Sequence, residues 1–259
     1  MEPALDTERT AIMKSGKTAR LCSMGVLIWC AMADLDVWAT DDKSLSHPLS
    51  VEKTPGQNFD LGHYKLQLPV AGHRGVEEIS GLGSYQSKYF YTDPSSGAMV
   101  FSCPDNGATT KGTHYPRTEL RSLENWTFTG NHQLTATLAV IQQTGSRDII
   151  IGQIHGDGKG SEALKLRWHD GQIIAGVKTN PGTSEARQTI VSGIALGEKF
   201  TYTIAQQGHN VTVTVNGSRQ TFVYGAGWRG ETVYFKAGNY LQDNSASGSS
   251  GIVAFYGLQ

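Results

Sequence analysis

The chain has 259 residues, with 22 Lys and Arg against 23 Asp and Glu, which gives a formal net charge of -1. With 38% hydrophobic and 17% charged residues, it is too apolar for a disordered chain and too balanced for a nucleic-acid binder. The 31 glycines, about 12% against a usual ~7%, follow no collagen period and indicate many turns, as in a secreted all-β protein.

The N-terminal segment has the pattern of an export signal. Lys14, Lys17 and Arg20 precede the apolar run 21–33, which is shorter than a membrane span of ~20 residues but fits a signal peptide. A buried helix is the alternative, but it accounts less well for the flanking basic residues. Residues 1–33 are therefore predicted to be a signal peptide, and the mature protein to be secreted, extracellular or periplasmic, with no membrane attachment.

Cys103 is the one cysteine of the predicted mature chain, because Cys22 and Cys30 fall within the signal. A single cysteine excludes an internal disulfide and a cysteine-based zinc site. Because Cys103 follows the apolar run 99–101, we expect it to pack as a small hydrophobe rather than to act as a nucleophile.

Residues 34–57 are polar, contain Pro48 and Pro55, and predict an arm or linker. From Phe59 onward, apolar and polar residues alternate with a period of two, which predicts about a dozen strands. No linker interrupts residues 58–259, so they are predicted to form one all-β domain, a sandwich or jelly roll. The clearest predicted strands are 132–141, 163–168, 200–204 and 211–215.

Two hairpins follow from the turn residues. Asp170-Gly171 separates the apolar-polar runs 164–169 and 172–177, and Asn216-Gly217 separates 211–215 from 218–224. Both dipeptides accept the positive φ angles of a type I′ turn, so each is predicted to join two antiparallel strands.

Three strand segments carry long polar side chains on the face away from their apolar residues, as strand alternation requires. If the three strands are neighbours in one curved sheet, these side chains form a polar groove. They are Arg117, Glu119 and Arg121 of the first segment, Gln153 and His155 of the second, and Tyr234, Lys236 and Tyr240 of the third.

Each segment also has a structural interpretation. An Arg-x-Glu-x-Arg strand fits a surface salt-bridge ladder worth ~0.2–1 kcal/mol per pair, a lone His is often structural, and Tyr and Lys often cover apolar surface. Together, however, they offer cationic and amide donors for an anionic oxygen, a base and an acid. That combination is what removing a proton beside a carboxylate requires.

Other chemistries fit less well. The sequence has no G-x-S-x-G nucleophile motif, no H-E-x-x-H helix and no histidines at metal-ligand spacing. A β-sandwich glycosidase would need two carboxylates, whereas this polar set holds Glu119 alone, between two arginines that favour its ionised form.

The three segments, in this order, resemble the motifs of alginate lyases of polysaccharide lyase family 7. They read Arg117-Thr-Glu-Leu-Arg121, Gln153-Ile-His155 and Tyr234-Phe-Lys-Ala-Gly-Asn-Tyr240, and the flanking runs 58–69 and 99–110 are also similar to that family. The resemblance covers residues 58–259. It implies a β-jelly roll of two curved antiparallel sheets, with a concave groove that binds a polyuronate and cleaves it by β-elimination.

The resemblance also implies roles for the motif residues. Arg117 and Gln153, with His155, hold the uronate carboxylate, and Tyr240 donates a proton to the departing O4 oxygen. His155 is the expected base on guluronate, and Tyr240 serves both roles on mannuronate. Arg121, Lys236 and Tyr234 are assigned to substrate binding, and Glu119 to orienting the arginines.

The resemblance implies an acidic polysaccharide, alginate, as partner, no redox cofactor or catalytic metal, and no nucleic acid, and we expect a monomer. Ile154, between Gln153 and His155, resembles the family variants that act on guluronate-containing blocks. Two alternatives remain: a lyase for another polyuronate such as glucuronan, and a non-catalytic carbohydrate-binding jelly roll. A binding module would need no base and acid side by side.

Overall fold

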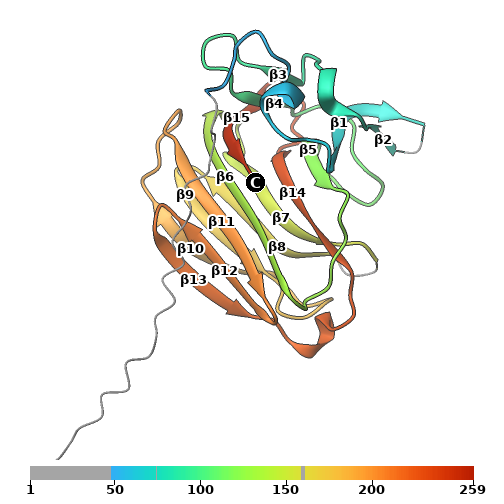
Figure 1. The fold of residues 1–259 in the computed structure, drawn as a ribbon, viewed down its shortest axis with the longest axis vertical. Helices are drawn as coiled ribbons and strands as arrows, with labels where there is room; N and C mark the ends of the chain where they lie inside the picture. The colour runs from blue at the N-terminus through green and yellow to red at the C-terminus, as the bar shows by residue number, and fades with distance from the viewer. Residues whose placement is uncertain (1–47, 74, 159–160) are drawn as a thin grey trace, which may run out of the picture. The chain divides into compact units, whose positions relative to one another are not determined.

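In the computed structural model, residues 48–73, 75–158 and 161–259 are described, and they form an almost entirely β structure (Figure 1). Besides the strands, these residues contain one helical turn, α1 (Pro55–Asn58), and two 3-10 turns, η1 (Leu82–Ser84) and η2 (Ala226–Trp228). The strands are β1 (Tyr64–Gly72), β2 (Gly75–Ile79), β3 (Phe90–Thr92), β4 (Met99–Pro104), β5 (Arg117–Ser122), β6 (Asn131–Gln142), β7 (Asp148–Gly156), β8 (Glu162–His169), β9 (Gln172–Val177), β10 (Ala186–Ser192), β11 (Phe200–Gln207), β12 (Asn210–Val215), β13 (Ser218–Val223), β14 (Val233–Leu241) and β15 (Ser250–Leu258).

The strands form two antiparallel sheets that pack as a jelly-roll sandwich, as predicted. Sheet A has the order β10-β9-β8-β7-β14-β5-β1-β2, and sheet B has the order β13-β12-β11-β6-β15-β4-β3. One apolar core contains residues from both sheets, including Leu120 and Phe235 of sheet A and Phe101 and Phe255 of sheet B. Cys103 belongs to this core and is fully buried, which confirms its predicted packing role.

Both predicted hairpins are confirmed. Asp170 and Gly171 have φ angles of 45° and 83° and join β8 to β9, while Asn216 and Gly217 have φ angles of 46° and 87° and join β12 to β13. Positive φ at both central residues is the type I′ geometry, whose twist matches that of the strands it connects.

The three polar strand segments become neighbours in sheet A. β14 lies between β7 and β5, although β5 and β14 are more than a hundred residues apart in the chain (Figure 1). Leu120, Ile154, Phe235 and Ala237 of these strands all point into the core. The alternate side chains therefore share the opposite face, which we call the polar face of sheet A.

A bulge in β14 sets how this strand meets its two neighbours. Ala237 pairs with Gly152 and Tyr240 with Ile150, so β14 has one residue more than β7 at this point, while its pairing with β5 stays regular. Gly238 lies in the bulge with φ 142°, a conformation that L side chains rarely adopt.

The start of the described chain packs onto the domain. Asn58 Nδ2 donates to the Ser50 and Gly97 carbonyls at 2.8 and 3.2 Å, and Leu49 packs against the core. The predicted signal peptide, 1–33, and residues 34–47 of the predicted arm lie outside the described residues. Within the described part of the chain, no helix is long and apolar enough to cross a membrane.

We predict that Gly238→Ala lowers the free energy of unfolding by about 2–4 kcal/mol. Its Cβ would lie 2.8 Å from the Thr118 carbonyl oxygen and 2.9 Å from Glu119 Cα, and backbone atoms cannot move aside cheaply. Urea unfolding measures the change. Gly83→Ala is the control, because a Cβ there meets nothing within 4 Å, and equal losses for the two variants would contradict the prediction.

Candidate active site

Strand register brings all eight predicted site residues together on the polar face. Tyr234 of β14 pairs with His155 of β7, and Lys236 pairs with Gln153 on one side and with Arg121 of β5 on the other. Tyr240 pairs with Arg117, and Gly238 with Glu119. Directly paired residues of antiparallel strands have neighbouring side chains, so the three motifs form one continuous polar surface.

Glu119 is the centre of this surface and is completely buried. Gln153 Nε2 donates to its Oε1 at 2.5 Å, while Arg117 and Lys236 both form ion pairs with its Oε2. Arg117, Gln153 and Lys236 are themselves less than 5% exposed, so this is not the surface ladder considered as an alternative. A buried carboxylate with three partners fixes the positions of all three.

Lys236 is held by a second acceptor that sequence reasoning missed. Its Nζ donates to Gln67 Oε1 of β1 at 2.8 Å, and Gln67 in turn donates to Glu78 of β2 at 2.8 Å. Alternation in 64–67 places Gln67 on the polar face, but sequence alone does not show that β1 adjoins β5. Burial lowers the pKa of Lys236 below its ordinary value, although the Glu119 carboxylate opposes this shift.

His155 is arranged as a neutral imidazole. Its Nδ1 lies 2.8 Å from the Gly156 carbonyl oxygen, which can only accept a hydrogen bond, so Nδ1 carries the proton and Nε2 carries the lone pair. The Tyr234 hydroxyl lies 3.1 Å from the same Nδ1, and the two rings stack at 5.3 Å. Burial, assisted by the positive charge of Lys236, lowers the pKa of His155 to about 4.

Tyr240 lies against Arg117, whose guanidinium is 3.8 Å from the centre of the tyrosine ring. Burial raises the pKa of Tyr240 above its ordinary value, while the positive charge of Arg117 opposes the rise. The tyrosine is therefore a protonated donor at neutral pH, and the contact with Arg117 fixes its ring.

The contacts of Arg121 differ from those expected, since Glu119 was predicted to orient both arginines. Its guanidinium stacks 3.9 Å from the centre of the Tyr234 ring and donates to Asp157 at 2.9 Å and to Asn125 at 3.1 Å. Glu119 binds Arg117 but not Arg121, because Asp157, just beyond the end of β7, provides the nearer carboxylate. Asp157 and Asn125 lie in connecting segments, where strand alternation gives no signal.

The described residues hold no cluster of three or more His, Cys, Asp or Glu side chains placed to bind a metal ion. Burial also raises the pKa of the Cys103 thiol far above its ordinary value, so this group is not a nucleophile.

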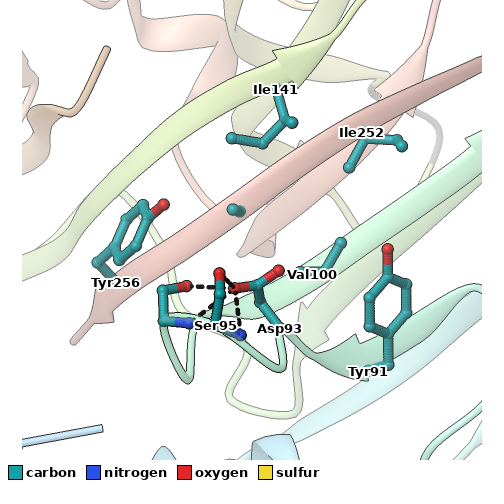
Figure 2. Close-up of a pocket in the computed structure, with 9 residues that line it drawn as sticks. Tyr91, Asp93, Ser95, Val100, Ile141, Ile252 and Tyr256 are labelled. Atoms are coloured by element: carbon teal, nitrogen blue, oxygen red, sulfur yellow. Dashed lines mark hydrogen bonds between the residues drawn. The ribbon is translucent and has the colours of Figure 1, made fainter. Parts of the chain in front are cut away.

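A separate hollow of about 320 Å³ lies on the outer face of sheet B (Figure 2). Tyr91 and Tyr256 flank it, and its floor includes Val100 and Ile252. The Asp93 carboxylate there accepts hydrogen bonds from Ser95 and Ser96 of its own loop, which lower its pKa. The hollow contains none of the predicted site residues.

The chain belongs to the alginate lyase family, since a family model of that description matches residues 59–259. It is 40% identical to alginate lyase A1-II', a member of polysaccharide lyase family 7, with a TM-score of 0.75 over 80% of this chain and 97% of that one. An alginate lyase from Pseudomonas aeruginosa is 32% identical, with a TM-score of 0.72 over 78% and 98% of the two chains. An alginate lyase from Klebsiella pneumoniae is 28% identical over 79% of this chain and 90% of its own length.

We predict that Glu119→Gln lowers the free energy of unfolding by about 3–5 kcal/mol, because it leaves Arg117 and Lys236 as buried cations without a carboxylate. Glu78→Gln is the matched control, since Glu78 pairs with Lys65 where the two side chains are 38% and 26% exposed. It should cost at most ~1 kcal/mol. Denaturant unfolding measures both, and similar midpoints would show that the buried contacts do not stabilise the fold.

Proposed function

We propose that this protein cleaves alginate by β-elimination, producing a 4,5-unsaturated uronate at the new chain end. The observation that carries the proposal is the row of Arg117, Gln153, His155 and Tyr240 on one face of three adjacent strands. The related alginate lyase A1-II' has been seen with substrate (GGMG) and with product (GGG), which supports an alginate oligosaccharide as the partner.

Elimination begins with loss of the proton on C5, beside the uronate carboxylate. This carbon acid is so weak that the negative charge developing on the carboxylate must be stabilised. In the proposal, Arg117 and the Gln153 amide supply that stabilisation. Glu119 holds both donors, so they need little reorganisation when the charge forms.

The base and acid complete the reaction. On guluronate, His155 Nε2 takes the C5 proton, the C5–H electrons form the C4–C5 double bond, and the C4–O4 bond breaks. Tyr240 gives its proton to the departing O4 oxygen. On mannuronate, where proton and leaving group lie on the same side, Tyr240 must first lose its proton; its phenolate then takes the C5 proton and passes it to the departing O4 oxygen. The neutral state of His155 and the protonated state of Tyr240 support the base and acid roles on guluronate.

Guluronate-containing blocks are the proposed preferred substrate, on the resemblance of the Gln153-Ile154-His155 motif. Ile154 points into the core, so its influence acts through packing beneath the two residues that it separates. A non-catalytic binding module is disfavoured, because carbohydrate binding alone gives no reason for a neutral imidazole next to a buried Arg, Lys and Glu network. Secretion, based on the pattern of residues 1–33, is part of the proposal and is tested by sequencing the N-terminus of exported protein.

The deciding assay mixes purified protein with polyguluronate, polymannuronate and glucuronan, and follows the ultraviolet absorbance of the unsaturated product. Absorbance growth on the two alginate blocks, faster on polyguluronate, is the expected result. Growth on glucuronan alone would replace alginate with another polyuronate. Binding without any absorbance change would favour the carbohydrate-binding module.

We predict that Tyr240→Phe lowers kcat by a factor of about 10²–10⁴, the usual contribution of a positioned acid or base, while polymer affinity stays nearly unchanged. Only the hydroxyl is lost, and the ring still packs on Arg117. Initial rates on both alginate blocks provide the measurement. Tyr91→Phe makes the same chemical change on sheet B and should leave kcat unaltered. Wild-type turnover by Tyr240→Phe would remove Tyr240 as the acid.

We also predict that kcat/KM on polyguluronate shows no loss centred near 6.5, the ordinary pKa of His, as the pH falls. The base must be neutral, and the pKa of His155 is lowered to about 4, so its activity is lost only as the pH falls through that value. Polymannuronate is the comparison, because protonation of substrate carboxylates affects both polymers alike. An acid limb near 6.5 that occurs on polyguluronate alone would show that the imidazole is not held neutral.

A further inference from the structure

The polar face of sheet A continues beyond the candidate active site, over β8, β9 and β10. Strand register forms a row in which Gln153 pairs with Lys165, Lys165 with Gly176, and Gly176 with Arg187. Neighbouring strands lie about 4.8 Å apart, so Lys165 is one strand spacing from Gln153 and Arg187 is three. Cations therefore recur along a line that crosses the strands.

Lys165 has two carboxylate partners here: Glu162 of β8, which lies 2.6 Å from its Nζ, and Glu185, which also contacts two arginines. Glu185 precedes β10, and it lies 2.8 Å from Lys165 Nζ, 2.9 Å from an Arg167 nitrogen and 2.6 Å from Arg187 Nε. A Cβ on Gly176 would lie 2.5 Å from the Glu185 carboxyl carbon, so the absent side chain leaves the space in which the carboxylate sits. Glu185 is thus surrounded by three cations, two from β8 and one from β10.

One of these cations, Arg167, is incompletely satisfied. Arg167 is 2% exposed, yet its Nε has no hydrogen-bond partner among the described residues. Glu185 Oε2 is buried close to Lys165 Nζ, but it accepts no well-aligned hydrogen bond within the described part of the chain. Asp148 supplies the other carboxylate of Arg167, at 2.7 Å. Glu185 differs from Glu119 in its position, because Glu119 lies within β5 whereas Glu185 lies in the segment that precedes β10.

We infer that Glu185 occupies the place of a uronate carboxylate on Lys165 and Arg167, and that a bound polyuronate displaces it. The inference rests on the proposed function and extends it by assigning a substrate subsite one strand beyond the catalytic residues. Displacement exchanges one carboxylate for another on the same cations, and the connecting segment between β9 and β10 moves at lower cost than a central strand. Glu185 then determines which chain lengths bind well.

The test replaces Glu185 with Gln, which keeps the size of the side chain and removes its charge. Dissociation constants are measured by calorimetry for a graded series of alginate oligomers, in the Tyr240→Phe background, where turnover is slowed. Glu185→Gln should tighten binding roughly 3- to 10-fold for oligomers long enough to reach β8, and should leave shorter ones unchanged. In the chain with Tyr240 intact, KM should fall for the long oligomers and kcat should stay the same.

Two controls separate this effect from simpler ones. Glu52→Gln removes the same charge from an exposed position outside the network, so it should tighten binding little and at no particular length. Adding Lys165→Met to Glu185→Gln should abolish the gain. A purely structural Glu185 predicts a lower Tm with no tighter binding, and that result would overturn the inference.

The same measurements distinguish failure of this inference from failure of the proposed lyase function. If Glu185→Gln tightens binding of long oligomers, but neither it nor the wild type forms unsaturated product, the subsite is supported and the lyase function is lost. If lyase activity is present but binding gains nothing at any length, the function is supported and the inference about Glu185 is wrong.

Discussion

The buried carboxylate of Glu119 is the contact on which the candidate site depends. It lies fully buried between two cations and an amide, so it holds Arg117, Lys236 and Gln153 at fixed positions on three different strands. Burying these charges is costly unless all are paired, and for that reason the arrangement has little freedom to relax. Its rigidity also benefits chemistry, because donors that are already placed need no reorganisation when negative charge develops on a substrate.

The backbone of β14 and the proton-transfer groups, Tyr240 and His155, are also positioned around Glu119. Glu119 pairs with Gly238, where the bulge lets β14 keep regular pairing with β5 while it shifts against β7. Tyr240 is then placed on Arg117, and His155 on Tyr234. The positive charge of Lys236 adds to burial in lowering the pKa of His155. Burial keeps the base neutral, and the cations that a polyuronate needs add to the effect.

Strand alternation predicted which side chains share a face, and the Asp170-Gly171 and Asn216-Gly217 dipeptides predicted two hairpins, because both depend on local geometry. Strand order does not depend on local geometry. Nothing in the sequence places β14 between β5 and β7, or β1 beside β5, so Gln67 was missed as a partner of Lys236. The contact of Arg121 with Asp157 was likewise missed, because Asp157 lies in a connecting segment.

Net charge gave no indication of an acidic partner, and the ion pairs of the polar face explain why. Each of eight cations there lies within 4 Å of one of six carboxylates, so the face is positive although the whole chain carries a net charge of -1. An arriving polyuronate therefore exchanges partners with paired cations rather than neutralising free ones.

Where the resident carboxylate is buried in a strand, as Glu119 is, it stays and positions its cations. Where the carboxylate lies at the end of a connecting segment, as Glu185 does, it can move away, and specificity for chain length arises from that difference. The cations are Lys65, Arg117, Arg121, Lys165, Arg167, Lys178, Arg187 and Lys236, and the carboxylates are Glu78, Glu119, Asp148, Asp157, Glu162 and Glu185.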